Sequence, residues 1–256
     1  MNSHPTPPTI ALQLYTLRDF LKTPAQIAET LKKVRKIGYT AVELAGFGPI
    51  EPKELAAILD GEGLTCCGAH VPMEKLKTDF QRVSADHLLW KCQTLAVPGC
   101  WGKTLADFES FAADLNSLAP KCSAAGLPLG YHNHSHELVR YDGRTPFSVL
   151  LEKTSPNVWF EIDTYWLAHG GADPIDWISK VSGRIPCVHL KDMAIGADGK
   201  QFMAEIGEGN LNWPGILSAC AKSGTRWLVV EQDVCRRDPL ESIAISYRNL
   251  SRRPIT

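Results

Sequence analysis

Four segments of the chain end in side chains that bind metals or transfer protons, and each begins as an apolar run. They are LGYHNHSHE (Leu129 to Glu137), VWFEIDT (Val158 to Thr164), PCVHLKD (Pro186 to Asp192) and WLVVEQD (Trp227 to Asp233). Imidazoles and carboxylates are common ligands of divalent cations and common acids and bases in enzymes. The repetition predicts a site to which all four segments contribute.

The apolar runs are typical of buried strands, which place alternate side chains on the same face. The pairs that share a face are His132 with His134, Glu161 with Asp163, His189 with Lys191, and Glu231 with Asp233. If the strands are parallel neighbours, these polar pairs meet at one end of the sheet. The residues between them are mostly apolar and are expected to pack against covering helices.

Strand-like and helix-like segments alternate along the whole chain at intervals of roughly 30 residues, the length of a strand-plus-helix unit. The expected strands are Ile10 to Tyr15, Thr40 to Leu44, Leu64 to His70, Leu95 to Val97, Leu127 to His132, Asn157 to Asp163, Ile185 to Leu190 and Trp227 to Glu231. Ala194 to Asn210 is expected to be a long, glycine-rich loop. Eight such units joined by right-handed crossovers close most economically into a barrel.

The predicted fold class is therefore α/β, a (β/α)₈ TIM barrel that fills residues 1–256 as a single domain. The length of 256 residues and the hydrophobic content of 44% are sufficient for that core. The alternative is a doubly wound open sheet. Neither a G-x-G-x-x-G nor a G-x-x-x-x-G-K motif follows the first expected strand, and polar residues close strands all around the series.

Composition excludes several classes of protein. The formal net charge is −1, with no run of like charges, so no nucleic-acid or anionic membrane partner is expected. The 8 cysteines form no C-x-x-C pair, which favours a reduced cytoplasmic protein with buried thiols. The N-terminus has no signal-peptide pattern, and no run of about 18 apolar residues predicts a membrane span.

Asp163, His189 and Glu231 are suitable ligands for one divalent ion, which could be Mn²⁺, Mg²⁺, Co²⁺, Zn²⁺ or Fe²⁺. The alternative for each residue alone is a buried polar group that is satisfied by hydrogen bonds. Several carboxylates buried together are costly unless a cation or a proton compensates them. Their recurrence at equivalent strand ends therefore favours a metal site.

The segment that follows the fifth expected strand is the densest in functional groups. His132 and His134 point into the barrel if the strand keeps its alternation, whereas Glu137 lies beyond the strand and could fold back over the pocket. A surface histidine tract is the alternative. Lys191 is expected to hydrogen-bond a substrate oxygen or to stabilise a developing oxyanion. Its alternative role is a salt bridge inside the barrel with Glu161 or Asp163.

Polar or aromatic residues also stand at or beyond other strand ends. Tyr15, Glu43 and His70 are expected to have a structural role or to contact substrate rather than to take part directly in catalysis. Trp166 and Trp101 also follow strands, where an aromatic ring can stack on a sugar. Packing within the protein is the alternative for both tryptophans.

At these residues the sequence resembles the sugar phosphate isomerase/epimerase family of xylose isomerase-like TIM barrels, which also includes inosose dehydratases, tagatose epimerases and endonuclease IV. The resemblance runs from LQLYTLRD through GYHNHSHE, EIDTYW, HLKD and EIGEGNLNW to VVEQD. It implies one divalent metal bound by Glu, Asp, His and Glu, of which the last three map onto Asp163, His189 and Glu231. Where many relatives carry the first glutamate, this chain has His132, and the nearest carboxylate is Glu137. Either residue could complete the metal site.

The resemblance implies a metal-dependent isomerase or epimerase that moves a proton beside a carbonyl of a sugar or polyol through an enediolate. Glu231 would be the base, and His132 or His134 the acid. A lyase or hydratase that acts on a 3-keto-glycoside or an inosose is the second hypothesis, and a non-catalytic sugar-binding barrel is the third. An unphosphorylated substrate fits at least as well as a phosphorylated one. Apolar tryptophans are compatible with a homo-oligomer and equally with a packed monomer.

Overall fold

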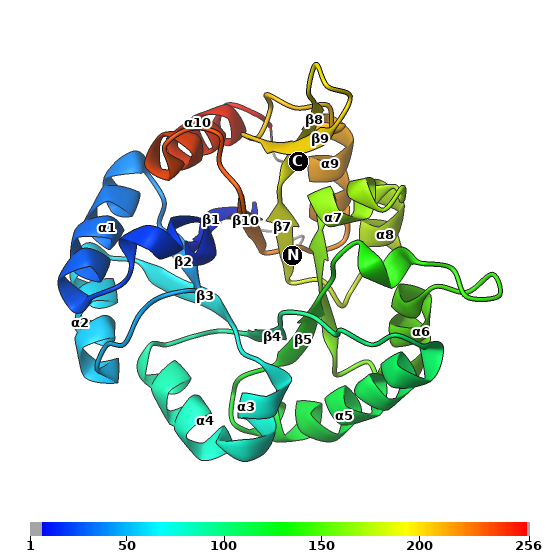
Figure 1. Cartoon of the computed structure of the whole chain (residues 1–256). Coiled ribbons are helices and arrows are strands. Elements are labelled where there is room, and N and C mark those ends of the chain that lie inside the picture. The colour runs from blue at the N-terminus through cyan, green and yellow to red at the C-terminus, as the bar shows by residue number, and fades with distance from the viewer. Residues whose placement is uncertain (1–6, 255–256) are drawn as a thin grey trace, which may run out of the picture.

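Eight parallel strands close into a barrel, and helices surround it (Figure 1). This computed structural model describes residues 7–254, so the expectation about a signal peptide, which concerns the N-terminus, lies largely outside the described residues. The strands are β1 (Thr9–Gln13), β2 (Ala41–Leu44), β3 (Thr65–His70), β4 (Leu95–Val97), β5 (Leu129–His132), β6 (Trp159–Asp163), β7 (Cys187–Leu190) and β10 (Trp227–Val230). Parallel pairing of β1 with both β2 and β10 closes the wall. The predicted (β/α)₈ barrel is confirmed.

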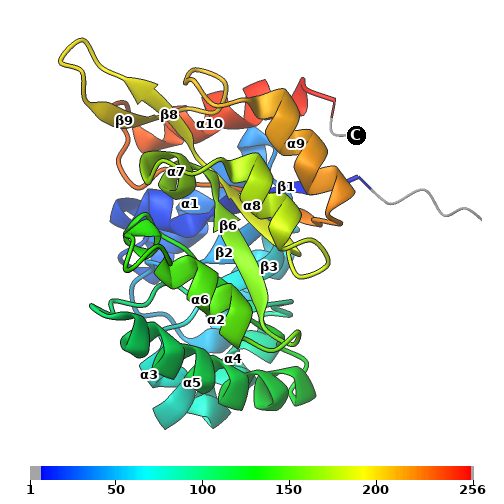
Figure 2. The same ribbon diagram turned by 90° about the vertical axis from the view of Figure 1, so that its right-hand side faces the viewer.

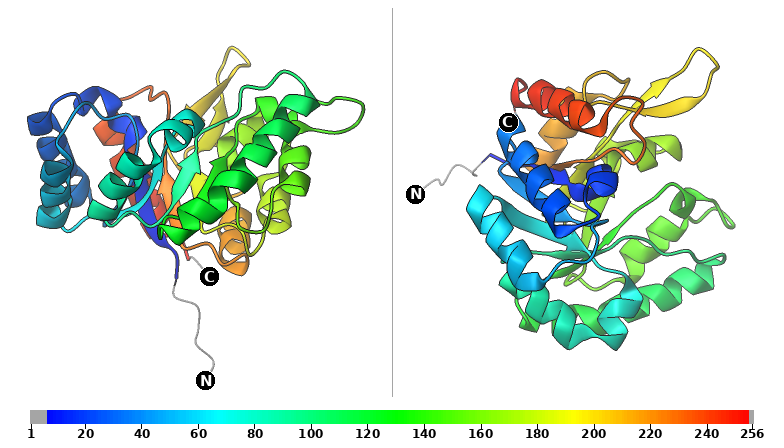
Figure 3. Two further views of the ribbon diagram at one scale, coloured as in Figure 1. Left: turned by 90° about the horizontal axis from the view of Figure 1, so that it is seen from below. Right: turned by 60° about the vertical axis from the view of Figure 1, so that its left-hand side comes forward.

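Helices follow the strands and cover the outside of the barrel (Figures 2 and 3). They are α1 (Pro24–Ile37), α2 (Pro52–Glu62), α3 (Met73–Thr78), α4 (Phe80–Leu89), α5 (Leu105–Ala124), α6 (Pro146–Lys153), α7 (Thr164–His169), α8 (Pro174–Lys180), α9 (Trp213–Lys222) and α10 (Pro239–Ser251), with 3₁₀ turns η1 (Leu14–Phe20) and η2 (His136–Leu138). Local chemistry sets their ends: the Thr23 hydroxyl accepts from the Gln26 amide before α1, and Thr104 and Asp107 form a capping box at α5. Of the described helices, none is long and apolar enough to cross a membrane.

The apolar side chains of the strands alternate between two cores. Residues that face outward join the core beneath the helices, among them Phe160, Ile162, Val188, Leu190, Leu228 and Val230, as expected. Inside the barrel, a separate cluster of Ala11, Ala41, Cys67, Ala96, Trp159, Cys187, Trp227 and Val229 forms the floor. Position 130 on β5 requires a glycine, because a Cβ there would lie 2.3 Å from the indole of Trp159. Above this floor the inward side chains are polar.

The segment after β7 differs from the expected loop. It forms an antiparallel hairpin of β8 (Asp192–Ile195) and β9 (Gln201–Ala204), which extends beyond the helical layer in Figure 2. The buried Asp192 carboxylate at the start of β8 holds the chain that follows β9. It accepts hydrogen bonds from the backbone N–H groups of Gly207, Gly209 and Leu211 and from Nε1 of Trp213. A Cβ at Gly209 would lie 2.3 Å from this carboxylate. Hydrogen bonds between residues that lie 15 or more positions apart in the sequence therefore order this segment.

Candidate active site

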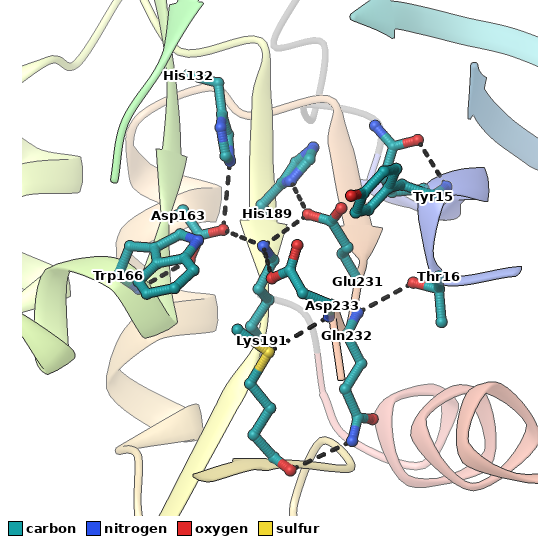
Figure 4. A network of polar contacts seen from close by, with 12 residues as sticks. Tyr15, Thr16, His132, Asp163, Trp166, His189, Lys191, Glu231, Gln232 and Asp233 are labelled. Carbon is teal, nitrogen blue, oxygen red and sulfur yellow. Dashed lines mark hydrogen bonds and ion pairs between the residues drawn. The ribbon is translucent and has the colours of Figure 1, made fainter. Parts of the chain in front are cut away.

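A cavity of about 940 Å³ opens where the strands end at their carboxyl side. Its lining includes His132, Lys191, Glu231 and Asp233, from the ends of β5, β7 and β10 or just beyond them. The parallel register places Asp163 on β6 beside His189 on β7, so neighbouring strands present their polar groups at one level. The convergence expected from the four segments is thus present in the structure (Figure 4).

Four buried side chains lie together at this level and could hold one cation. His132, Asp163, His189 and Glu231 each offer a ligand atom, and these atoms all lie within 4.8 Å of one another. Nε2 of His132 is 3.3 Å from Oδ2 of Asp163, and Nδ1 of His189 is 2.8 Å from Oε2 of Glu231. Figure 4 shows these side chains pointing toward one another from separate strands. We call this set the upper cluster.

The second nitrogen of His189 faces the barrel interior. Its Nε2 is 2.6 Å from Oε2 of Glu43 and 3.3 Å from Oε2 of Glu161. Gln13 donates to the same Glu43 oxygen at 2.9 Å, and Nε2 of His70 is 2.6 Å from Glu161. A carboxylate that accepts from one imidazole nitrogen leaves the other nitrogen free to bind a metal, an arrangement common in metal sites. Glu43, expected as a substrate contact or a structural residue, is fully buried here, whereas His70 also lines the cavity.

Lys191 is surrounded by carboxylates. Its Nζ is 2.9 Å from Asp163, 2.8 Å from Glu231 and 2.7 Å from Asp233. The salt bridge with Asp163 that the sequence left open is therefore present, and the residue also lines the cavity. Burial would lower the pKa of this ammonium group, but Asp163 and Glu231 raise the pKa well above its usual value. Lys191 is thus a charged donor at the cavity wall.

Carboxylates surround the lysine and two of the imidazoles of the site. The carboxylates are Glu43, Glu161, Asp163, Glu231 and Asp233. Burial would lower the pKa of His189 and of His70, but Glu161 and Glu43 raise both, so these imidazoles share protons with the carboxylates. Burial would raise the pKa of Glu231, but Lys191 and His189 hold it well below its usual range, so this carboxylate is ionised. Oε1 of Glu43 and Oε1 of Glu161 are buried without a hydrogen-bond partner among the described residues. A divalent cation that displaces the shared protons fits this set of nitrogen and oxygen donors.

Two of the three histidines in the segment from Leu129 to Glu137 carry no charge near neutral pH. Burial lowers the pKa of His132 to about 4 and that of His134 to about 2. A neutral imidazole can bind a metal, so the geometry favours His132 as a ligand, and the role of His132 or His134 as the acid stays a prediction. His134 lines the cavity instead.

Glu137, expected as a metal ligand, does not lie in the upper cluster. Its Oε1 accepts from the Tyr131 hydroxyl, and its Oε2 accepts from the backbone N–H of His134 at 2.7 Å. These two donors hold the carboxylate beneath the turn that follows β5, where burial raises its pKa to about 8. Of the two residues that the sequence offered for this position, the structure therefore brings only His132 to the cluster.

Tyr15 and Trp166 line the cavity, as expected for residues that contact substrate. The chain turns into η1 after Gln13, so Tyr15 lies beyond the strand that was expected to include it. Asp233 also lines the cavity and accepts a hydrogen bond from Lys191, a role that was not predicted from the sequence. Its position two residues after Glu231 is the signal that identifies it, because both side chains then share one face.

The family model described as xylose isomerase-like TIM barrel matches residues 31–250. The rhizopine catabolism protein MocC of Rhizobium meliloti is 26% identical over 88% of this chain and 81% of that protein. An inosose dehydratase of Mesomycoplasma hyopneumoniae (strain 7448) is 26% identical over 82% of this chain and 83% of that protein.

Solved structures agree in fold. A sugar phosphate isomerase/epimerase from Parabacteroides distasonis superimposes with a TM-score of 0.82 at 24% identity, covering 100% of this chain and 97% of that chain. An IolI protein with a bound zinc atom gives a TM-score of 0.73 at 13% identity, with 94% and 96% of the two chains covered. The matches thus extend over nearly the whole barrel.

Proposed function

Since the chain belongs to the xylose isomerase-like TIM barrel family, we propose that it is a divalent-metal-dependent isomerase or epimerase acting on a sugar or polyol by proton transfer beside a carbonyl. The observation that carries the proposal is the upper cluster of His132, Asp163, His189 and Glu231 next to a large cavity. Two imidazoles and two carboxylates, from four separate segments, meet there with their ligand atoms within 4.8 Å of one another. A sugar-binding barrel without catalysis would not need this arrangement.

The four residues of the upper cluster would hold the ion, and Glu43 would orient His189 through Nε2. Two imidazoles and two carboxylates suit Zn²⁺, Fe²⁺, Co²⁺ or Mn²⁺ better than Mg²⁺, which prefers oxygen ligands alone. The zinc atom bound by the IolI protein, which has the same fold, supports a divalent ion as the partner of these residues. The bound ion would supply electrostatic stabilisation for negative charge on a substrate oxygen.

Residues of this chain would move the proton. Glu231 is ionised and lines the cavity, so it can accept a proton from the carbon next to a carbonyl. Lys191 lies 2.8 Å from Glu231 and donates to an oxygen of the substrate, which holds the reacting carbon near this base. Return of the proton from Glu231 to the former carbonyl carbon, together with transfer of the hydroxyl proton of the neighbouring carbon to the former carbonyl oxygen, completes an isomerisation. Return to the opposite face, as in an epimerisation, needs a second donor.

A dehydratase is the second candidate, and Asp233 is the observation that favours it. Burial and the nearby charge of Glu231 raise the pKa of Asp233, whereas the pKa of Glu231 is lowered. Two carboxyl groups with opposite shifts form a suitable acid and base. Glu231 would take the proton beside the carbonyl, the C–O bond at the next carbon would break, and the hydroxyl would leave as water with the proton of Asp233. The inosose dehydratases among the relatives support this reaction class.

The test begins with protein purified without chelator. Elemental analysis should find about one divalent ion per chain. Keto-sugars and inososes incubated with the protein in D₂O should then take up deuterium beside the carbonyl. A rearranged product with the same elemental composition as the substrate would establish an isomerase or epimerase. A product that has lost one water molecule would establish a dehydratase. Bound sugar without deuterium uptake would overturn both and leave a binding protein.

A further inference from the structure

The cavity at the barrel mouth has two unlike sides. One side carries the charged residues Lys191, Glu231 and Asp233, and the other is lined by Val97, Pro98 and Trp101. Its volume of about 940 Å³ is near the upper end of the range of about 300–1,000 Å³ for pockets that hold drug-sized ligands. One sugar ring does not fill such a space. We propose that the substrate is a glycoside with two linked rings, of which the reacting sugar lies on the charged side and the second ring stacks on Trp101.

Trp101 presents an indole to solvent at the edge of this cavity. Its side chain is 72% exposed, the largest exposure among the exposed large hydrophobic residues. The opposite face of the indole is occupied by His136, whose ring is stacked at 4.5 Å with an interplanar angle of 20°. A flat apolar surface with one covered face and one open face is suited to stacking on the ring of a ligand.

The loop that carries Trp101 is held firmly by the β5 segment. The backbone N–H of Cys100 donates to the Tyr131 hydroxyl at 3.0 Å, and Nε2 of His136 donates to the Cys100 carbonyl at 2.7 Å. Glu137 in turn accepts from Tyr131, so the carboxylate expected to bind metal instead fixes this loop. A platform that is already ordered loses little conformational freedom when it binds a ligand. This fixation favours a recognition surface over a loose exposed side chain.

Aromatic rings connect this platform to the upper cluster. The Trp101 ring lies 5.3 Å from His134, which lies 5.0 Å from His132 and 5.5 Å from Trp166. Nδ1 of His134 and Nε1 of Trp166 are buried atoms with no hydrogen-bond partner among the described residues. Both residues line the cavity with their rings.

The charges of the cavity favour a neutral second ring. Among the lining residues, Lys191 alone is a lysine or arginine, and three carboxylates already surround its ammonium group. A phosphate would meet carboxylates without a free cation to bind it. Both an aromatic aglycone and a second sugar are neutral rings that can stack on an indole, and the experiment below separates them.

Calorimetric titration of the metal-loaded protein tests this inference, which rests on the proposed function for the reacting ring. The probes are methyl β-glucoside, phenyl β-glucoside and methyl β-cellobioside, repeated in the galactose and xylose series. The second ring should tighten binding about 3- to 10-fold, as expected for one aromatic contact. Trp101→Ala should remove this gain in affinity without weakening the binding of the one-ring probe. Trp101→Phe should keep part of the gain.

The outcomes distinguish the two proposals. A gain with the phenyl probe alone identifies an aromatic aglycone, and a gain with the cellobioside alone identifies a second sugar. Equal binding of one-ring and two-ring probes, or a gain that survives Trp101→Ala, would overturn the second-ring site and leave the proposed function intact. No binding of any probe in any series would overturn the second-ring site, whereas the proposed function is decided separately by deuterium uptake into keto-sugars and inososes. Val234→Ala, at a 66% exposed residue that does not line the cavity, is the matched control.

Discussion

The floor and the mouth of the barrel are built from the same strands but have opposite characters. The floor contains Trp159 and Trp227 packed among alanines, cysteines and a valine. The mouth, a few residues further along, contains the upper cluster and Lys191. The floor is stabilised by its own packing, whereas the mouth gathers several buried carboxylates around Lys191 and imidazoles that share protons with them.

This difference distinguishes the layer of the barrel that stabilises the fold from the layer that carries the proposed chemistry. Apolar groups are stabilised when they leave water, so the floor favours folding without a partner. Buried like charges are stabilised only by a cation, a proton or a ligand, so the mouth is incomplete by its own chemistry. Substitutions in the two layers should therefore have separable effects.

The largest effect is expected for Glu231→Gln in the mouth. The amide keeps the shape of the side chain but removes the base and a charged ligand, so turnover should fall by about 10²–10⁴-fold and metal content should fall with it. Steady-state kinetics and elemental analysis measure both. Glu241→Gln, at an exposed position in the first turn of α10, is the control and should change neither. Retention of both metal and turnover in Glu231→Gln would refute the assigned role.

The next effect is expected in the floor, for Trp159→Ala. Loss of a large buried side chain leaves a cavity, and the free energy of unfolding should fall by about 3–5 kcal/mol. Urea denaturation measures this change, while the metal content per folded molecule should remain that of the wild type. The exposed Trp101→Ala serves for comparison and should change stability by less than about 0.5 kcal/mol. If Trp159→Ala released the metal without changing stability, the two layers would not be separable.

A smaller effect on the metal is expected for Glu43→Gln. Glu43 accepts from Nε2 of His189, and an amide oxygen is a weaker acceptor than a carboxylate. The affinity for metal should fall by about 10–100-fold, as is usual for residues that orient a ligand. Competition with a chelator of known affinity provides the measurement. Glu137→Gln removes another buried carboxylate outside the upper cluster, and an equal loss there would contradict the assignment of ligands.

The last prediction concerns the pH dependence of stability, an effect that is gradual because it is spread over several pH units. Burial raises the pKa of Glu137 to about 8 from its ordinary value of 4.5, so the folded protein retains a proton that the unfolded chain releases between these values. Relative to Glu137→Gln, the wild type should therefore lose stability as the pH rises from about 4.5 to about 8, by up to about 1.4 kcal/mol per pH unit. Urea titrations of both proteins at several pH values measure the difference. Parallel profiles would show that Glu137 is ionised throughout.

Local periodicity was sufficient to predict much of the fold and part of the site. The apolar runs before Asp163, His189 and Glu231 place each side chain at the end of a buried strand, because alternation along a strand depends on neighbouring residues alone. The same argument predicted that Lys191 would face the interior. It did not predict the hairpin after β7, because that hairpin depends on the buried Asp192 and on segments far along the chain.

The sequence by itself determined the alternation of strands and helices, the barrel that they form, and the supply of acids and imidazoles at its mouth. The tertiary structure alone decided which of them meet. His132 joins the upper cluster and Glu137 does not, since the latter is held by Tyr131 and by the turn after β5. Periodicity along a strand reports the face on which a side chain lies. The distance between side chains of different segments depends on how the whole barrel closes and on where each loop returns.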